Sequence, residues 1–473
     1  MSQAFDFLTS GGKAGGLWKS ASGAAGRVVA RAVVGEGHPL VLSMPVRPLV
    51  LALLATAAAA QTAPSGPSAT ATPAEAPAPA PPAILVSADD NGFQIRSADD
   101  AFALRIRGDA QTDGRFFAGD AEELGVDQLY LRRARVNLQG TVGGRYDFKL
   151  MPNFGQGRVE IQDAFLDARF TPAFAVQAGK FKVPLGLEWL RSPTDLHLVE
   201  LGLPSALVPR RDVGVMAHGR VAGGRLTYEL GAFDGALDGQ NADVDASDGK
   251  DVAARLFALP FLRTEGPLRG LGLGIAATWG DESGSMATPA VPSYRSVGGR
   301  MVDRLRAGTA DSTTVLADGA RVRYSPQGYL YAGPASVLAE YVVSTQAVRL
   351  GAQTADLTAS AWQVVGGYVL TGERATYGRL RPARPLDGTG GIGALEATAR
   401  YGELRYDADA FPLFASPTAN ARRTRAWAVG LSWYPTANVR AMVNYERTTF
   451  ACPDAGTLLP SEDLVLTRFQ IAF

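Results

Sequence analysis

Arginines at alternating positions are the residues in this sequence best suited to contact a charged ligand. Arg105 and Arg107 are two positions apart, and so are Arg133 and Arg135. Side chains at i and i+2 of a β-strand lie on one face, so each pair would present two guanidinium groups together. A guanidinium is always charged, and its planar fork of donors matches an oxyanion. If these segments are strands, the spacing predicts a surface that attracts anions.

Residues that catalysis or metal binding would require are scarce. Cys452 is the single cysteine, which excludes a disulfide within the chain and a metal site built from cysteines. The histidines His38, His197 and His218 are scattered along the sequence. Ser205 and His197 fall in one expected loop, but Ser205 lacks the glycine pattern of a nucleophile elbow. We therefore expect no enzyme, no metal and no cofactor; an esterase activity lost on Ser205→Ala would revive the enzymatic hypothesis.

Composition excludes two further classes of protein. The 473 residues have a formal net charge of zero, which gives no global basic footprint for nucleic acid. Mean hydropathy is +0.01, and after residue 60 no run approaches the about 18 apolar residues that a membrane helix needs. A transmembrane β-barrel is not excluded by this test, because only every second residue of its strands faces lipid.

The N-terminal region is typical of a targeting segment followed by a spacer. Residues 44–60 combine a short basic start, the apolar run 49–54 and small residues up to Ala60, which predicts a signal peptide. We expect translation to begin at Met44, which leaves 1–43 as an extension without structure; the alternative is an unusually long signal. A buried helix is the other interpretation of 44–60. Residues 61–90, rich in Ala and Pro, are expected to be a periplasmic linker.

From residue 101 onward, apolar and polar residues alternate. In 102–117 the even positions are mostly apolar or small, whereas the odd positions carry Arg, Asp and Gln. This period of two continues for about fifteen residues, longer than the usual globular strand of about six. Reading on, we predict sixteen strands, at 101–117, 128–142, 144–152, 160–171, 173–181, 210–222, 225–234, 250–260, 269–280, 320–331, 334–349, 358–370, 392–407, 423–434, 437–450 and 463–473.

Connections between these strands alternate in length. Short turns at 171–173, 222–224 and 333–334 fall on one side, and longer loops at 118–127, 182–209, 235–249 and 281–319 fall on the other. Short periplasmic turns and long external loops are typical of an outer-membrane barrel. The sequence thus predicts an all-β fold, a 16-stranded antiparallel transmembrane β-barrel over 91–473 with long inward-folding loops. A large soluble β-sandwich or β-helix is the alternative fold.

The final strand gives the sharpest single indication. Its apolar face runs from Val465 to the terminal Phe473, while Leu466, Arg468 and Gln470 face the other way. A terminal Phe closing an alternating strand resembles the signal by which barrel-assembly machinery recognises outer-membrane proteins. We expect that machinery, and the lipid and lipopolysaccharide of the outer membrane, to be partners.

Four stretches together resemble the phosphate-selective porin O and P family. Leu131-Arg132-Arg133-Ala134-Arg135 is the first, and Tyr368-Val369-Leu370-Thr371-Gly372-Glu373 with 378–382 is the third. The second joins Gly179-Lys180-Phe181-Lys182-Val183-Pro184 to the Leu203–Pro209 and Arg211–Val215 stretches, and the fourth is Leu395–Tyr401. Their order and number, with the final strand, span about residues 90–473.

This resemblance implies a homotrimeric sixteen-stranded porin of the cell outer membrane that conducts small anions, with phosphate or polyphosphate as candidate solutes. Within it, loops 182–209 and 281–319 would fold into the lumen, as would 371–391 from the periplasmic side. The match at 131–135 gives the anion-lining role to Arg133 and Arg135. Alternation extends the predicted anion path to Arg105, Arg107, Arg133, Arg135, Arg145, Lys149, Arg169, Arg220 and Arg400. Candidates on the constricting loops are Lys180, Lys182, Arg191, Arg379 and Arg381.

Two other functions stay open. Only four lysines follow the signal, so the family's phosphate specificity does not carry over residue by residue. The Arg and Asp alternation is also compatible with a hydrogen-bonded wall that stiffens a general, weakly selective porin. A non-conducting outer-membrane binding barrel is the second alternative.

Overall fold

The computed structural model describes residues 84–118, 125–243, 249–454 and 459–473. The expected signal peptide, the extension before it and linker residues 61–83 lie outside these ranges. Among the described residues, no helix is long and apolar enough to cross a membrane.

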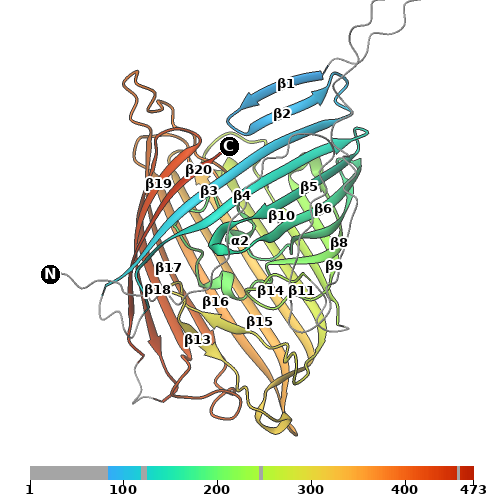
Figure 1. Ribbon diagram of the computed structural model, residues 1–473, viewed down its shortest axis with the longest axis vertical. Helices are drawn as coiled ribbons and strands as arrows, with labels where there is room; N and C mark the ends of the chain where they lie inside the picture. The colour runs from blue at the N-terminus through green and yellow to red at the C-terminus, as the bar shows by residue number, and fades with distance from the viewer. Residues whose placement is uncertain (1–83, 119–124, 244–248, 455–458) are drawn as a thin grey trace, which may run out of the picture. The chain divides into compact units, whose positions relative to one another are not determined.

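Sixteen antiparallel strands close into one barrel (Figure 1). Each pairs with its neighbours along the chain, and β20 closes the ring on β3, from Leu464↔Phe117 to Ala472↔Asp109. The barrel strands are β3 Ala103–Phe117, β4 Gln128–Val142, β5 Tyr146–Asn153, β6 Glu160–Thr171, β7 Phe174–Lys182, β8 Arg211–Val221, β9 Leu226–Phe233, β10 Asp251–Ala258, β11 Leu271–Ser283, β14 Leu316–Ala332, β15 Ala335–Leu350, β16 Gln353–Val369, β17 Ala394–Tyr406, β18 Arg423–Tyr434, β19 Val439–Ala451 and β20 Glu462–Ala472.

The predicted fold is confirmed, strand by strand. Each of the sixteen predicted ranges overlaps one barrel strand, with ends displaced by a few residues. The largest displacement is at β16, which starts at Gln353 rather than 358 because the β15–β16 hairpin turns tightly at Gly351. That turn makes 351–352 a short connection at the end where the other connections are long.

A hairpin that the sequence pattern did not indicate precedes the barrel. Strands β1 Ile84–Asp89 and β2 Gly92–Ser97 pair with each other, and β2 also pairs with the first residues of β3. The hairpin therefore begins inside the stretch 61–90 that was expected to be a linker. It continues the wall where β20 ends, since Phe473 packs beside Phe93 of β2, with ring centroids 6.0 Å apart. A Cβ at Gly108 of β3 would lie 2.9 Å from the ring of Phe473, so a larger residue there would push this ring out of its place.

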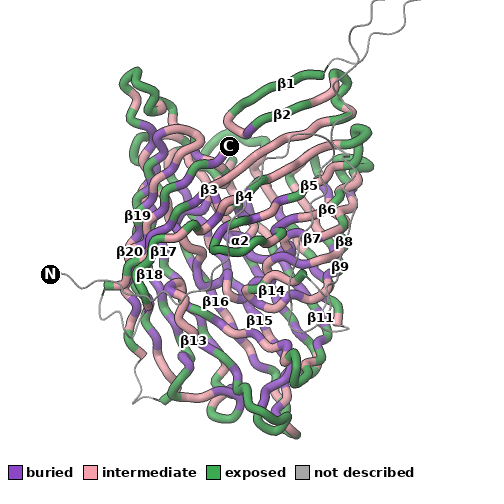
Figure 2. Tube along the Cα trace, viewed as in Figure 1, coloured by how far each residue is buried: buried purple, intermediate pink, exposed green. Residues whose placement is uncertain are grey.

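Buried and exposed residues alternate along the barrel strands (Figure 2), and this alternation gives the barrel a polar interior and an apolar outer face. On β18, Leu431 is 42% exposed on the outer face, whereas Arg400 on the adjacent strand β17 faces the lumen and is 4% exposed. This is the reverse of a soluble protein, whose apolar side chains face inward.

The two ends of the barrel differ in their connections. Both ends of the barrel sequence and the short turns 172–173 and 333–334 lie at one end, here called the turn end. At the opposite end, the loop end, lie the long connections 183–210, 234–250 and 284–315. The last of these carries its own two-stranded sheet, β12 Ser293–Arg295 and β13 Met301–Arg304. Two longer connections, 259–270 and 370–393, also lie at the turn end.

Candidate functional site

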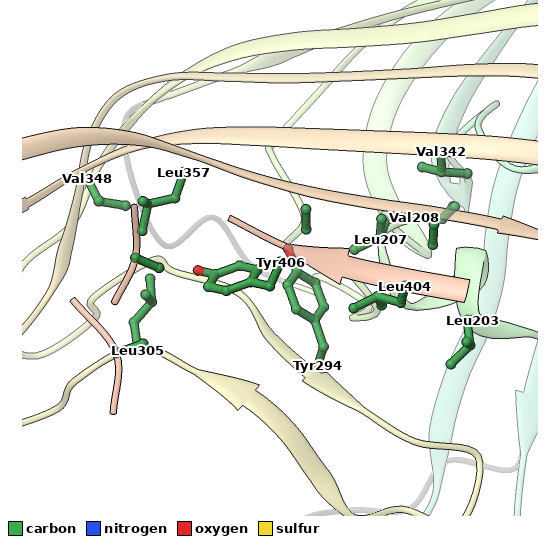
Figure 3. Close-up of a cluster of buried hydrophobic side chains, with 14 of the residues drawn as sticks. Leu203, Leu207, Val208, Tyr294, Leu305, Val342, Val348, Leu357, Leu404 and Tyr406 are labelled. Carbon is green, nitrogen blue, oxygen red and sulfur yellow. The ribbon is translucent and has the colours of Figure 1, made fainter. Parts of the chain in front are cut away.

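Residues 183–210, here called the inner segment, leave β7 and cross the lumen before returning to β8. They contain the one-turn helix α2 (Leu187–Leu190), which Figure 1 shows about midway along the barrel, and a 3₁₀ turn at Leu203–Ala206. Leu203, Leu207 and Val208 pack in one buried cluster with Val342 of β15 and Leu404 of β17 (Figure 3). The inner segment thus rests on the far wall of the barrel by apolar contacts.

Hydrogen bonds among two buried carboxylates, one glutamine and the backbone hold the inner segment against this wall. Glu340 of β15 accepts hydrogen bonds from the backbone N–H of Leu187 at 2.6 Å and of Glu188 at 3.3 Å. The side-chain amide of Gln363 donates to both Glu188 and Glu340, at 2.8 Å each. Gly202 lies against Gln363 so closely that a Cβ would come within 1.7 Å of its Oε1. Any side chain at position 202 would therefore have to displace the amide of Gln363.

Two arginines of the far wall also hold the inner segment in place by hydrogen bonds. Arg400 of β17 donates to Glu446 at 2.9 Å and to the backbone carbonyl of Glu200 at 2.8 Å. Arg440 of β19 donates to the carbonyl of Leu196 at 2.6 Å. These arginines are almost fully buried, and they satisfy backbone carbonyls that no strand neighbour could reach.

The inner segment lines two cavities. The turn-end cavity, about 580 Å³, is bordered by Lys182, residues 192–195 and the strand β3–β8 side of the lumen. The loop-end cavity, about 920 Å³, is bordered by Trp189, residues 200–203 and the connection carrying β12.

Basic residues outnumber acidic ones in both cavities. Those lining the loop-end cavity are Arg115, Arg132, Arg133, Arg210 and Arg295 against Glu200 and Asp238. Those lining the turn-end cavity are Arg107, Arg135, Lys149, Lys182, Arg211 and Arg379 against Asp109, Asp163, Asp195 and Glu229. The excess of positive charge on both sides of the inner segment would lower the free energy of an anion there.

Several of these arginines form no ion pair with a carboxylate of the described residues. Arg133 donates to the amide oxygen of Gln111 at 2.7 Å, and Arg115 to the carbonyl of Gly298 at 3.0 Å. Arg107 and Arg135, which face inward from β3 and β4, form no ion pair with a carboxylate of the described residues either, and Arg135 keeps a buried Nε without a hydrogen-bond partner there. A run of arginines without carboxylate partners therefore follows β3 and β4 from one cavity to the other.

A β-bulge adds one more arginine to this run. The register of β3 and β4 shifts between Gln111↔Arg133 and Thr112↔Leu131, so Arg132 is the extra residue. Arg132 then faces the lumen beside Arg133 and pairs with Glu200 of the inner segment at 3.3 Å. Burial alone would raise the pKa of Glu200, but the positive charge of Arg132, followed by Arg468 and Arg133, outweighs it and lowers the pKa to about 2. Strict alternation missed Arg132 because a bulge breaks the period of two.

Comparison with protein families decides what this barrel is. The model of the family "Phosphate-selective porin O and P" matches residues 103–473. The chain belongs to this family. It is therefore a porin of the outer membrane, and the resemblance found in its sequence motifs is confirmed. By the usual arrangement of such barrels, the turn end is periplasmic and the loop end external.

Solved porins share the fold at low sequence identity. The outer-membrane channel DcaP of Acinetobacter baumannii has a TM-score of 0.52 and 13% identity over 81% of this chain and 99% of its own. OmpF of Salmonella typhi, solved with daunomycin, has a TM-score of 0.50 and 12% identity over 79% and 99%. An anion-selective porin from Comamonas acidovorans has a TM-score of 0.49 and 12% identity over 79% and 100%. No curated protein sequence matches the chain.

The porin brings together four of the nine residues predicted to form the anion path. Arg107, Arg135 and Lys149 line the turn-end cavity, and Arg133 lines the loop-end cavity. Lys149 is paired with Asp163 at 2.6 Å, so its charge is locally balanced.

The other five residues of that prediction lie elsewhere. Arg105 donates to Gln94 of β2, and Arg400 holds the inner segment. Arg169 pairs with Asp147 near the periplasmic rim. Arg220, near the end of β8, and Arg145 are exposed, and Arg145 belongs to the turn 143–145 rather than to the strand predicted from 144.

The five residues predicted to lie on constricting loops also lie in different parts of the structure. Arg191 lies on the inner segment, where its guanidinium stacks over the ring of Tyr377 at 5.1 Å. Lys180 and Lys182 do not lie on a loop, because β7 extends to Lys182. Lys180 pairs with Asp243 of the external connection 234–250, and Lys182 donates to the carbonyls of Trp189 and Arg191 at 2.7 and 2.8 Å.

The connection 370–393 reaches into the lumen from the periplasmic end. Tyr377 donates to the carbonyl of Leu187 at 2.8 Å, which ties this connection to the inner segment. Arg379 lines the turn-end cavity and donates to the carbonyls of Asp90 and Ala472, at 3.0 and 3.2 Å. Arg381 pairs with Asp90 on the surface. Inward folding thus explains why a long connection lies at the end of short turns.

Proposed function

We propose that this porin conducts small anions in preference to cations, along the arginines of β3 and β4. The observation that carries the proposal is that Arg115, Arg133, Arg135 and Arg107 line the two cavities without carboxylate partners. Arg468 of β20, by contrast, is neutralised, since it makes two hydrogen bonds to Asp113, at 2.8 and 2.7 Å.

A path of this kind favours passage over tight binding. Each arginine offers donors to a passing oxyanion, while Gln111 and backbone carbonyls hold the guanidinium in place. Because the sites succeed one another along the wall, an anion can exchange one arginine for the next without being held at a single deep minimum. Phosphate and polyphosphate are the solutes that we propose to test first, as the family's name suggests.

Planar-bilayer recording of the purified porin in a KCl gradient tests the proposal. A reversal potential of the sign set by chloride is expected, and Arg133→Gln with Arg135→Gln should move it towards the cation side. Arg169→Gln is the matched control, because Arg169 is paired with Asp147 outside both cavities. A cation-signed potential in the wild-type porin would refute anion preference, and the absence of any current would indicate a binding barrel.

A phosphate titration of the chloride current separates the specific form of the proposal from the general one. Phosphate that occupies the arginine path should reduce the chloride current in the wild type at lower concentration than in the double variant. An equal effect on both proteins would leave a general, weakly selective anion porin.

We further propose that the porin is a homotrimer with its β5–β10 wall at the subunit contacts. Strands β5, β9 and β10 have eight residues each, fewer than the about 9–11 that a strand needs to cross a bilayer. Residues such as Leu166, 65% exposed on the outer face of β6, would then be covered by protein rather than by lipid. Cross-linking of the purified porin in detergent should give trimers.

Assembly of the barrel is the third element of the proposal. The terminal Phe473 packs in the groove that Gly108 leaves open, and its backbone exchanges two hydrogen bonds with Gly108, at 3.0 and 3.1 Å. We propose that the barrel-assembly machinery recognises this terminal strand before the ring closes on β3. Deletion of Phe473 should reduce insertion into the outer membrane.

A further inference from the structure

Outward aromatic side chains form a belt on one part of the barrel. Trp362 of β16 and Tyr401 of β17 lie with ring centroids 5.6 Å apart, and Trp427 of β18 and Tyr445 of β19 lie 5.4 Å apart. Tyr401 and Trp427 are directly paired across the sheet, so the two pairs are continuous. Trp and Tyr gather where the hydrocarbon of a membrane meets its headgroups. The belt therefore marks the level of the external headgroups on this wall.

Directly beyond the belt, towards the loop end, the outer face becomes strongly charged. Four arginines and two acids occupy the next outward positions, here called the arginine rim: Arg405, Arg423, Arg425, Arg447, Glu403 and Asp463. Their side chains lie outside the lumen because they keep the alternation of Tyr401, Trp427 and Tyr445. The rim thus has two positive charges in excess at the level of the lipid headgroups.

One buried acid orients two of these arginines. Glu403, only 4% exposed, accepts from Nε of Arg405 and, at 2.6 Å, from Nε of Arg425. Both arginines use Nε for this contact, and their terminal nitrogens make no other hydrogen bond to the described residues. Their side chains stay 65% and 45% exposed. Two pairs of guanidinium donors are therefore held in place and left open to the outside.

Arg423 adds a third guanidinium group beside these two. It is directly paired across the sheet with Arg405, it is exposed, and it has no ion pair to a carboxylate of the described ranges. Arg405 and Arg425 share the single carboxylate of Glu403 and Arg423 contacts no described carboxylate, so the three guanidinium groups keep positive charge that a further anion can balance. Arg447 is already paired with Asp463, at 3.5 Å.

We propose that Arg405, Arg423 and Arg425 bind a phosphate group of lipopolysaccharide in the outer leaflet. Guanidinium groups bind phosphate oxygens through paired hydrogen bonds. Clusters of basic residues at the level of the headgroups recognise phosphorylated lipids. At the loop end of the β5–β10 wall Ile161, Val215 and Val252 are apolar and exposed, and the nearby Lys250 lies 3.8 Å from Asp234, so the arginine cluster belongs to one side of the barrel. The inference is independent of anion conduction, because these side chains face away from the lumen.

Binding of purified rough-type lipopolysaccharide to the porin in detergent, followed by native mass spectrometry or fluorescence, tests this site. The variant combines Arg405→Gln, Arg423→Gln and Arg425→Gln. The matched control combines Arg145→Gln, Arg169→Gln and Arg220→Gln, which remove the same charge near the periplasmic rim. We expect affinity to fall at least about tenfold in the variant, the loss of more than one charge-assisted contact, and to stay unchanged in the control.

Two further measurements make the result decisive. Lipopolysaccharide stripped of its phosphates should bind wild type and variant alike, and inorganic phosphate should bind wild type no more tightly than the variant. Heat-modifiable gel mobility verifies that the variant barrel is folded, and its reversal potential should equal that of the wild type. Equal affinity of wild type and variant for intact lipopolysaccharide would overturn the proposal, and so would preferential binding of free phosphate by the wild type.

Discussion

The β3–β10 wall and the β14–β19 wall of this porin differ both on the inner face and on the outer face. On the inside, the β3–β10 wall presents arginines without carboxylate partners to the cavities, such as Arg107 and Arg135. The β14–β19 wall instead buries its charges in pairs and holds the inner segment, as Arg400 does with Glu446 and the carbonyl of Glu200. The comparison teaches that inward arginines can border a cavity or anchor the inner segment, depending on whether that segment crosses the lumen against them.

The outer faces of the two walls differ as well. The β3–β10 wall carries no Trp, and strands β5, β7, β9 and β10 are eight or nine residues long. The β14–β19 wall has strands of 12 to 17 residues, and Trp362, Trp427 and Trp433 are exposed on it. Aromatic side chains and a full membrane span are features of a lipid-facing wall, so we assign lipid to the β14–β19 wall and other protein to the β5–β10 part of the first wall.

The largest effect should come from removing the anchor. Arg400→Leu would leave the buried carboxylates of Glu188 and Glu446 without their guanidinium partner, a change that costs about 3–5 kcal/mol. We expect a lower free energy of unfolding in urea. We also expect a larger, noisier single-channel current, because the inner segment is no longer fixed to the wall by Arg400. Arg169→Leu breaks an exposed pair and should cost at most about 1 kcal/mol. If both variants behaved alike, the division into an anchoring and a conducting wall would be wrong.

An intermediate effect should distinguish the outer faces. Leu166→Arg on β6 and Leu431→Arg on β18 both place a charge at an exposed outer position, 65% and 42% exposed. On a lipid-facing wall the charge should cost about 2–4 kcal/mol near the bilayer centre, so Leu431→Arg should lower the yield of folded barrel. Leu166→Arg should instead shift the porin from trimer to monomer, as measured by light scattering in detergent. Trimers of undiminished stability in Leu166→Arg would argue against a subunit contact there.

The smallest effect concerns the pair of Arg132 and Glu200 in the loop-end cavity. Glu200→Gln releases Arg132 from its carboxylate and should raise anion selectivity by roughly twofold, as one more free charge would along a multi-site path. Because the pKa of Glu200 is about 2 instead of 4.5, the wild-type carboxylate stays charged at pH 4.5. The difference in reversal potential between wild type and variant should therefore be the same at pH 7 and pH 4.5. A difference that falls by about half at pH 4.5 would show that Glu200 titrates at its ordinary pKa of 4.5.

Much of the barrel could be predicted because its strands are specified locally. Alternation along 102–117, 423–434 and 463–473 assigns each side chain to the lumen or to the outer face without knowledge of its neighbours. The same rule placed Arg107, Arg133 and Arg135 in the lumen, where the cavities lie. It failed at Arg132, because a bulge inserts one residue and only the pairing with β3 reveals it.

Pairing partners and loop paths could not be inferred in this way. Arg400 and Arg135 have the same parity and the same side chain, yet the first holds the inner segment and the second borders a cavity. What separates them is where residues 183–210 cross the lumen, and that path depends on Leu203, Leu207 and Gly202 fitting against β15–β17.

The sequence by itself determined the strand number, the polar interior, the apolar exterior and the family, since each of these follows from period-two alternation or from local motifs. Only the tertiary structure decided which arginines are neutralised, how the inner segment divides the lumen, and that an arginine rim lies beyond the aromatic belt on a single wall. The physical reason is that the charge balance of a side chain depends on groups brought close by folding, such as Glu446 beside Arg400 and Glu403 between Arg405 and Arg425.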